Sequence, residues 1–173
     1  MAHSLSMEVT HVASYLDKFK RFCLKMNEKS AKAFEEITNL DPEAEHYNDK
    51  IRKVVKDFDK EFEEDWEHQN DEFKLFIEDI SDVAKHSSDE YVIYSLKSYA
   101  AIERELKDIR KKKFKKLMET IEDSRMYAKA DNDYVLALAY ANILNNIKKN
   151  DDRLEQTITK LNKITKLKEE DDD

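Results

Sequence analysis

The chain has 173 residues, with 31 basic and 39 acidic side chains, a formal net charge of −8, no glycine and a single proline. Phosphate-binding loops, dinucleotide-binding turns and nucleophile elbows need glycine where the backbone takes a positive φ or a ligand comes close, so their standard forms are excluded. Tight hairpins also favour glycine, and no window shows sustained alternation of apolar and polar residues. We therefore expect an all-α protein.

The sequence also predicts where the protein is located and how many domains it has. The first ten residues lack the cationic start and apolar run of a secretory signal. No stretch approaches the roughly 18 consecutive apolar residues that predict a membrane-spanning helix. The single cysteine, Cys23, has no partner for an internal disulfide. We expect one domain, residues 1–173, in the reducing environment of the cytoplasm.

The first predicted helix covers residues 5–40. Its apolar residues are spaced alternately by four and three, which is the heptad pattern of a helix buried along one stripe. Cys23 lies on this stripe, so we expect a buried, unreactive thiol. Asp41 and Pro42 are typical of the N-cap and first position of a following helix.

The second predicted helix covers residues 42–86. Phe58, Phe62 and Trp66 are spaced by four and four, an eleven-residue pattern that relaxes left-handed supercoiling, and we place all three in the core. The opposite face is strongly acidic, and we call it the acidic belt. The belt comprises Asp57, Asp59, Glu61, Glu63, Glu64, Asp65, Glu67, Asp71 and Glu72.

The third predicted helix covers residues 88–129, with Ser87 and Glu90 at the spacing of a capping box. Its opening, residues 91–102, is apolar on more than one side, which exceeds what one buried face requires. Such an excess favours contact with a partner. The candidate contact residues here are Tyr91, Ile93, Tyr94 and Tyr99.

The same helix carries the one strongly basic run of the chain, six cations in the seven positions 110–116. If the second and third helices are antiparallel about residue 87, this run lies beside residues 58–64 of the acidic belt. We therefore predict that charge pairing aligns these two helices, and that the cations left over can attract an anionic ligand. The candidates are Arg110, Lys111, Lys112, Lys113, Lys115 and Lys116.

The fourth predicted helix covers residues 132–168, followed by an acidic tail at 169–173. Asp131 and Asn132 are candidate caps. Residues 134–144 are again apolar nearly all round, and Tyr134, Leu138 and Tyr140 are candidates to contact a partner. Asp151 falls on the apolar stripe, which predicts a kink or short break near Asn150.

Four long amphipathic segments with short connections predict an elongated, coiled-coil-like, up-and-down four-helix bundle with antiparallel neighbours. The alternative is an open helical hairpin assembly that completes its core by dimerising. The second segment contains two pairs with the spacing of the Glu-x-x-His motif of di-metal bundles. Glu43 with His46 matches the motif, and Asp65 with His68 approximates it. Such a site needs pairs on separate helices, so we expect no metal, cofactor or catalytic site, and no enzyme activity.

Two functions remain. The first is a scaffold or interaction protein that binds a protein partner, or itself as a homodimer, through apolar helix faces. The second is peripheral binding of anionic membranes through residues 110–116; in elongated shape and basic patches the chain resembles a small membrane-shaping module of the BAR type. Nucleic acid is disfavoured, because the net charge is negative and only Phe114 could stack a base within the run.

Overall fold

The computed structural model of the chain describes residues 2–86, 104–105 and 107–171. These residues form the long helices α1 (Ala2–Thr38), α2 (Tyr47–His86) and α5 (Tyr134–Asp171), the shorter helix α4 (Lys115–Ala130), and the π-helical turn η1 (Arg110–Phe114). They contain no strand, so the expected all-α class is confirmed for them. Predicted helical residues 88–103 lie outside the described residues, and with them the candidates Tyr91, Ile93, Tyr94 and Tyr99.

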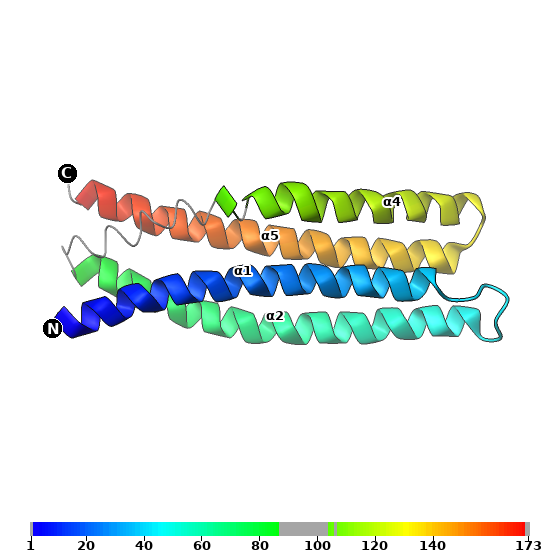
Figure 1. Ribbon diagram of the computed structural model, residues 1–173, viewed down its shortest axis with the longest axis horizontal. Coiled ribbons are helices and arrows are strands. Elements are labelled where there is room, and N and C mark those ends of the chain that lie inside the picture. Colours follow the sequence, from blue (N-terminus) through cyan, green and yellow to red (C-terminus); the bar gives the residue numbers. More distant parts are fainter. Residues whose placement is uncertain (1, 87–103, 106, 172–173) are drawn as a thin grey trace.

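The helices lie side by side along one long axis (Figure 1). The chain reverses direction at each of the two described connections, so α1 is antiparallel to α2, and α4 to α5 (Figure 1). Helix α5 contacts α1, α2 and α4. Helices α5 and α2 are in contact and run in the same direction. Helix α5 thus occupies the place beside α2 that the sequence predicted for the helix with the basic run.

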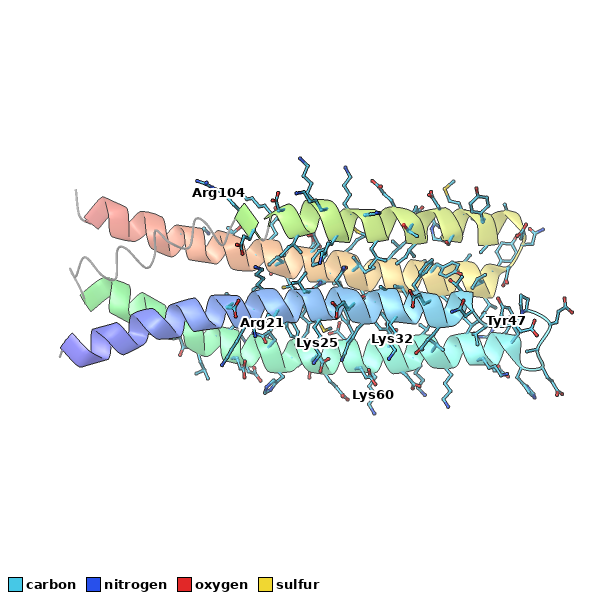
Figure 2. All side chains as sticks on the ribbon, viewed as in Figure 1. Arg21, Lys25, Lys32, Tyr47, Lys60 and Arg104 are labelled. Atoms are coloured by element: carbon cyan, nitrogen blue, oxygen red, sulfur yellow. The ribbon has the colours of Figure 1, made fainter. Side chains whose placement is uncertain are left out.

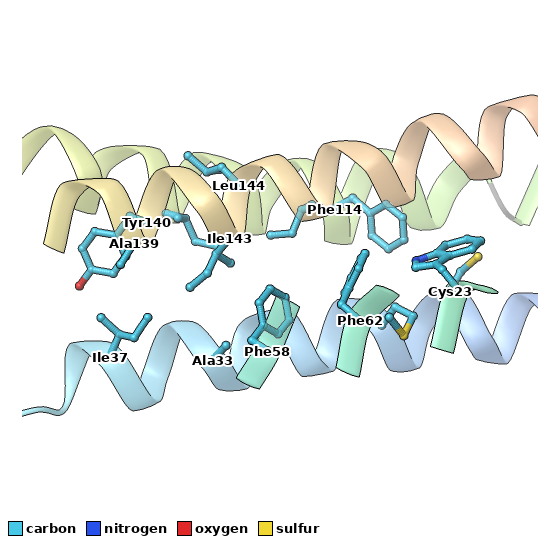
Figure 3. Packing of buried hydrophobic residues seen from close by; sticks show 14 of the residues in the cluster. Cys23, Ala33, Ile37, Phe58, Phe62, Phe114, Ala139, Tyr140, Ile143 and Leu144 are labelled. Atoms are coloured by element: carbon cyan, nitrogen blue, oxygen red, sulfur yellow. The ribbon is translucent and has the colours of Figure 1, made fainter. Parts of the chain in front are cut away.

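Apolar side chains on one face of each helix form the core. From Phe19 to Ile37, where the side chains of α1 are described, its heptad stripe is buried as predicted. Trp66 is only 1% exposed, with its ring edge-on to Phe22 at 4.9 Å between centroids. In Figure 3 the buried side chains of α1 and α2 face those of α5 and η1. Such burial contributes roughly 25 cal/mol per Å² of apolar surface. The largest fully buried side chains are Trp66, Phe19, Phe62, Phe114, Met26, Ile37, Ile51, Ile121, Ile143 and Ile147.

The connection between α1 and α2 is longer than predicted, because α2 begins at Tyr47 and not at Pro42. Asp41 does cap a turn: its side chain accepts a hydrogen bond from the Glu43 N–H at 3.0 Å, and its carbonyl accepts one from the Ala44 N–H at 3.0 Å. That turn does not continue into α2, because His46 has a φ of 62°, outside the helical region.

The connection between α4 and α5 lies where the sequence predicted it, but its cap is a different residue. The Asp133 side chain accepts the Leu136 N–H at 3.2 Å and caps α5, while Asn132 takes a φ of 60°, which asparagine tolerates. The predicted break near Asn150 is wrong. Helix α5 is continuous through this position: Asn150 is buried, at 1% exposure, and Asp151 is used in a hydrogen bond with a side chain of η1 and not in a cap.

A polar layer lies within the contact between α2 and α5. The half-buried Asp59 carboxylate accepts hydrogen bonds from the Asn142 amide at 3.0 Å and from the Asn146 amide at 2.6 Å. Asn146 is only 5% exposed and also donates to the Asn142 side-chain oxygen at 3.0 Å. Because a buried polar group without a hydrogen-bond partner destabilises the fold, this layer favours one register of the two helices over the others.

We expect Asp59→Ala to lower the free energy of unfolding by about 1–3 kcal/mol, because two partly buried amides lose their acceptor. Urea denaturation followed by circular dichroism measures the change. The matched control is Asp57→Ala, an exposed belt residue of the same helix, which should change stability by no more than about 0.5 kcal/mol. Equal effects of the two substitutions would contradict a stabilising role for the polar layer.

Candidate functional site

The basic run begins on the π-helical turn η1, where the Lys115 N–H donates to the carbonyl of Arg110, five residues earlier. Within the described part of the chain, Arg110 is the cation of the run that pairs with another helix. Its Nε and Nη2 donate to the two Asp151 carboxylate oxygens of α5 at 2.5 and 3.0 Å, and Nη2 also reaches Glu155 at 3.5 Å. This fork geometry is the strong, bidentate form of an arginine–carboxylate pair.

The predicted pairing between the basic run and the acidic belt is therefore wrong. The physical reason is that α5, and not the helix with the run, packs against the face of α2 that carries Asp59 and Glu63. Glu63 accepts a hydrogen bond from Arg153 of α5 at 3.4 Å, and Asp65 pairs with Lys29 of α1 at 2.5 Å. The other belt carboxylates are exposed: Asp57, Glu61, Glu64, Glu67, Asp71 and Glu72.

The Arg110–Asp151 pair is partly shielded, with each side chain 22% exposed. The hydrogen bond to Asp151 raises the pKa of Arg110 above the usual value of an arginine, against the opposing effect of burial. On the arginine side, the stability from this pair is fully present below the usual pKa of an arginine and is lost only as the pH rises through the raised pKa of Arg110. Arg110 therefore stays charged and holds α5 throughout the ordinary pH range.

The five lysines of the run are all exposed. Lys112 approaches Asp108 on its own helix at 3.8 Å, a distance at which an exposed pair contributes little. Arg104, one of the described residues before the run, extends away from the helices (Figure 2). Phe114 is 0% exposed and points into the core (Figure 3), so it is not available to stack a base or to insert into a membrane.

A second candidate site is an open groove between α2 and α5, with a volume of about 470 Å³. The α5 side carries Tyr134 and Leu138, which are 64% and 71% exposed and one helical turn apart. The α2 side carries the apolar Ile51 and Val55, and each is followed in the sequence by a cation, Arg52 or Lys56. The lining is Ile51, Arg52, Val55, Lys56, Asp59, Tyr134, Val135, Leu138, Ala139 and Asn142.

The groove continues into a more polar hollow of about 430 Å³. Asp59, Leu138 and Asn142 line both spaces, and Glu63 and Lys149 line the second. The two hollows therefore adjoin each other along the α2–α5 contact, and we call them together the channel; it is apolar at the end near the connections and polar farther along.

The third partner candidate of this helix, Tyr140, lies in the core at 4% exposure. Its hydroxyl shares a hydrogen bond with Thr38 at 3.0 Å, and its ring packs against Phe34 with centroids 5.3 Å apart. Tyr134 and Leu138 are thus exposed on the α5 side of the groove, whereas its α2 wall was not among the residues predicted from the sequence. The available signal was the repeat of apolar Ile51 and Val55 beside basic Arg52 and Lys56.

In the part of the chain that the structure describes, other chemistry-bearing residues do not assemble into a site. Burial, with a smaller effect from Asp151, raises the pKa of the Cys23 thiol, which is 1% exposed and so a poor nucleophile. Glu43 and His46 lie exposed on the α1–α2 connection. Among the residues that the structure describes, no group of three or more metal-ligating side chains could hold a metal ion, and no helix has the length and apolar character to cross a membrane.

We expect Arg110→Gln to lower the free energy of unfolding by about 1–3 kcal/mol, because Asp151 loses a charged donor at a partly shielded position. Lys111→Gln is the matched control, since it removes the same charge from the next, exposed residue and should change stability by no more than about 0.5 kcal/mol. Thermal or urea unfolding measures both. A destabilisation by Lys111→Gln as large as that by Arg110→Gln would contradict the assigned role.

Comparisons with protein-family models, with curated proteins and with solved structures found no match for this chain.

Proposed function

We propose that this chain is a non-enzymatic helical interaction protein that binds a partner, or a second copy of itself, through the groove between α2 and α5. In this proposal the chain is an elongated four-helix bundle in which consecutive helices are antiparallel, and the long helices serve as a rigid support. The observation that carries the proposal is the exposure of Tyr134 and Leu138 beside an apolar groove.

A scattered exposed leucine is ordinary on a protein surface, so the arrangement matters more than the exposure. Tyr134 and Leu138 lie on one face of α5, and apolar Val55 and Val135 lie with them along the same groove. The groove is open and runs between two helices, a geometry suited to the apolar face of a third helix. Binding there would remove these side chains from water, at roughly 25 cal/mol per Å² of apolar surface.

We expect Leu138→Glu to abolish groove binding, because it places a charge where an apolar contact forms. Two measurements report the loss: light scattering over a concentration series, and fluorescence anisotropy with a labelled helical peptide that carries leucine on one face and glutamine elsewhere. The wild-type chain should self-associate or bind the peptide, and the substitution should weaken that interaction by at least about tenfold.

Leu75→Glu is the matched control, because Leu75 is 64% exposed on α2 and lies beyond the groove. It should leave self-association and peptide binding unchanged, and neither substitution should alter the helical circular dichroism signal. The proposal is refuted if the wild-type chain remains monomeric and does not bind the peptide. It is also refuted if Leu138→Glu and Leu75→Glu have equal effects on binding.

A second function, peripheral binding of anionic membranes, is supported by the exposure of all five lysines of the basic run. Each lysine near an anionic surface contributes about 1 kcal/mol at physiological salt. Since Phe114 is buried and cannot insert, this binding would be electrostatic and would weaken as salt is raised.

Replacing Lys111, Lys112, Lys113 and Lys115 with glutamine should abolish salt-sensitive co-sedimentation with phosphatidylserine vesicles. The matched control replaces four exposed lysines of α1 and α2, namely Lys25, Lys32, Lys53 and Lys60, and changes the net charge equally; three of these are labelled in Figure 2. The control should retain binding. If both variants lose binding alike, total charge and not the basic run is responsible; if the wild type stays in the supernatant, the membrane function is wrong.

A further inference from the structure

The groove between α2 and α5 carries a charge pattern as well as an apolar surface. Arg52 and Lys56 lie one turn apart on α2, both exposed, and both line the groove beside Ile51 and Val55. Arg52 approaches Asp49 at 3.5 Å, but both side chains are mostly exposed, at 64% and 70%, so this pair is weak and easily exchanged for another.

The carboxylates along the groove are already engaged within the chain. Asp59 accepts hydrogen bonds from the amides of Asn142 and Asn146, and Glu63 accepts one from Arg153. An arriving ligand therefore meets two exposed cations at the apolar end of the groove, while Asp59, the carboxylate that lines this end, accepts hydrogen bonds from α5. The apolar end is complementary to a ligand that combines apolar and acidic groups.

The length of the channel suits a short helix. Along α2 its lining extends from Ile51 to Glu63, and along α5 from Tyr134 to Lys149. At 1.5 Å per residue these stretches correspond to roughly 18 to 22 Å, the length of about 12 to 15 helical residues. A helix of that length presents three or four apolar side chains on one face, spaced to contact Leu138 and Tyr134.

We propose that the groove binds an amphipathic helix of a partner protein in which acidic residues flank the apolar face, so that its carboxylates pair with Arg52 and Lys56. This inference rests on the proposed function and adds to it the chemical class of the partner. The apolar contacts with Tyr134 and Leu138 supply most of the affinity, and the cations select acidic helices over neutral or basic ones.

The test uses the full chain and three labelled peptides of about 16 residues that share one leucine face and differ only in the flanking residues, which are glutamate, glutamine or lysine. Fluorescence anisotropy should give affinities in the order glutamate, glutamine, lysine, with differences that shrink as salt is raised. The double substitution Arg52→Glu with Lys56→Glu should weaken the glutamate peptide by about tenfold and strengthen the lysine peptide.

A control with equal change in charge, Lys53→Glu with Lys60→Glu, alters two exposed cations of α2 that do not line the groove and should preserve the order. Equal binding of all three peptides, with Leu138→Glu still abolishing it, would overturn the acidic preference and leave the proposed function standing. Failure of all three peptides to bind a wild-type chain that also remains monomeric would overturn both. A wild-type dimer that Leu138→Glu converts to monomer would identify a second copy as the occupant and would also overturn this inference.

Discussion

Helices α2 and α5 run in the same direction and are joined through the hydrogen bonds that Asp59 accepts from Asn142 and Asn146. This contact decides most of the remaining arrangement. It brings Arg153 onto the face of Trp66, 4.9 Å from the ring centroid, where a cation–π interaction adds to the hydrogen bond with Glu63. Helix α4 then packs against α5, and the Arg110–Asp151 pair connects these two helices.

The same contact creates the binding surface that we propose. Because α2 and α5 lie together with their polar layer inside, the flank of the contact near the connections remains open and apolar. A structural contact and the proposed recognition site therefore share residues: Asp59 contributes to helix alignment and also lines the groove. A ligand helix would lie on a support that hydrogen bonds already hold in one position, which lowers the entropic cost of binding.

Which residues are buried could be predicted from the sequence, but which helices touch could not. A heptad stripe such as that of α1 shows which face of the helix is buried. It does not show the partner, because the apolar stripe of α2 can be buried against any apolar neighbour. The hydrogen bond between Asp59 and Asn142 joins residues 83 positions apart, and no local spacing indicates it. For this reason Tyr134 and Leu138 were recognised as exposed apolar candidates while the α2 side of their groove was not, and Arg110 was assigned to the wrong helix.

Because of the π-helical turn η1, the basic run can contain one more residue without a change in the packing of the helix that carries it. Ile109 and Phe114 both contact the core cluster although they are five positions apart, one more than a regular α-helical turn provides. The turn absorbs this additional residue, so α4 continues with Ile121 and Ala128 buried on one face. An extra charged residue is thus accommodated on the surface without rotating the apolar residues that follow it.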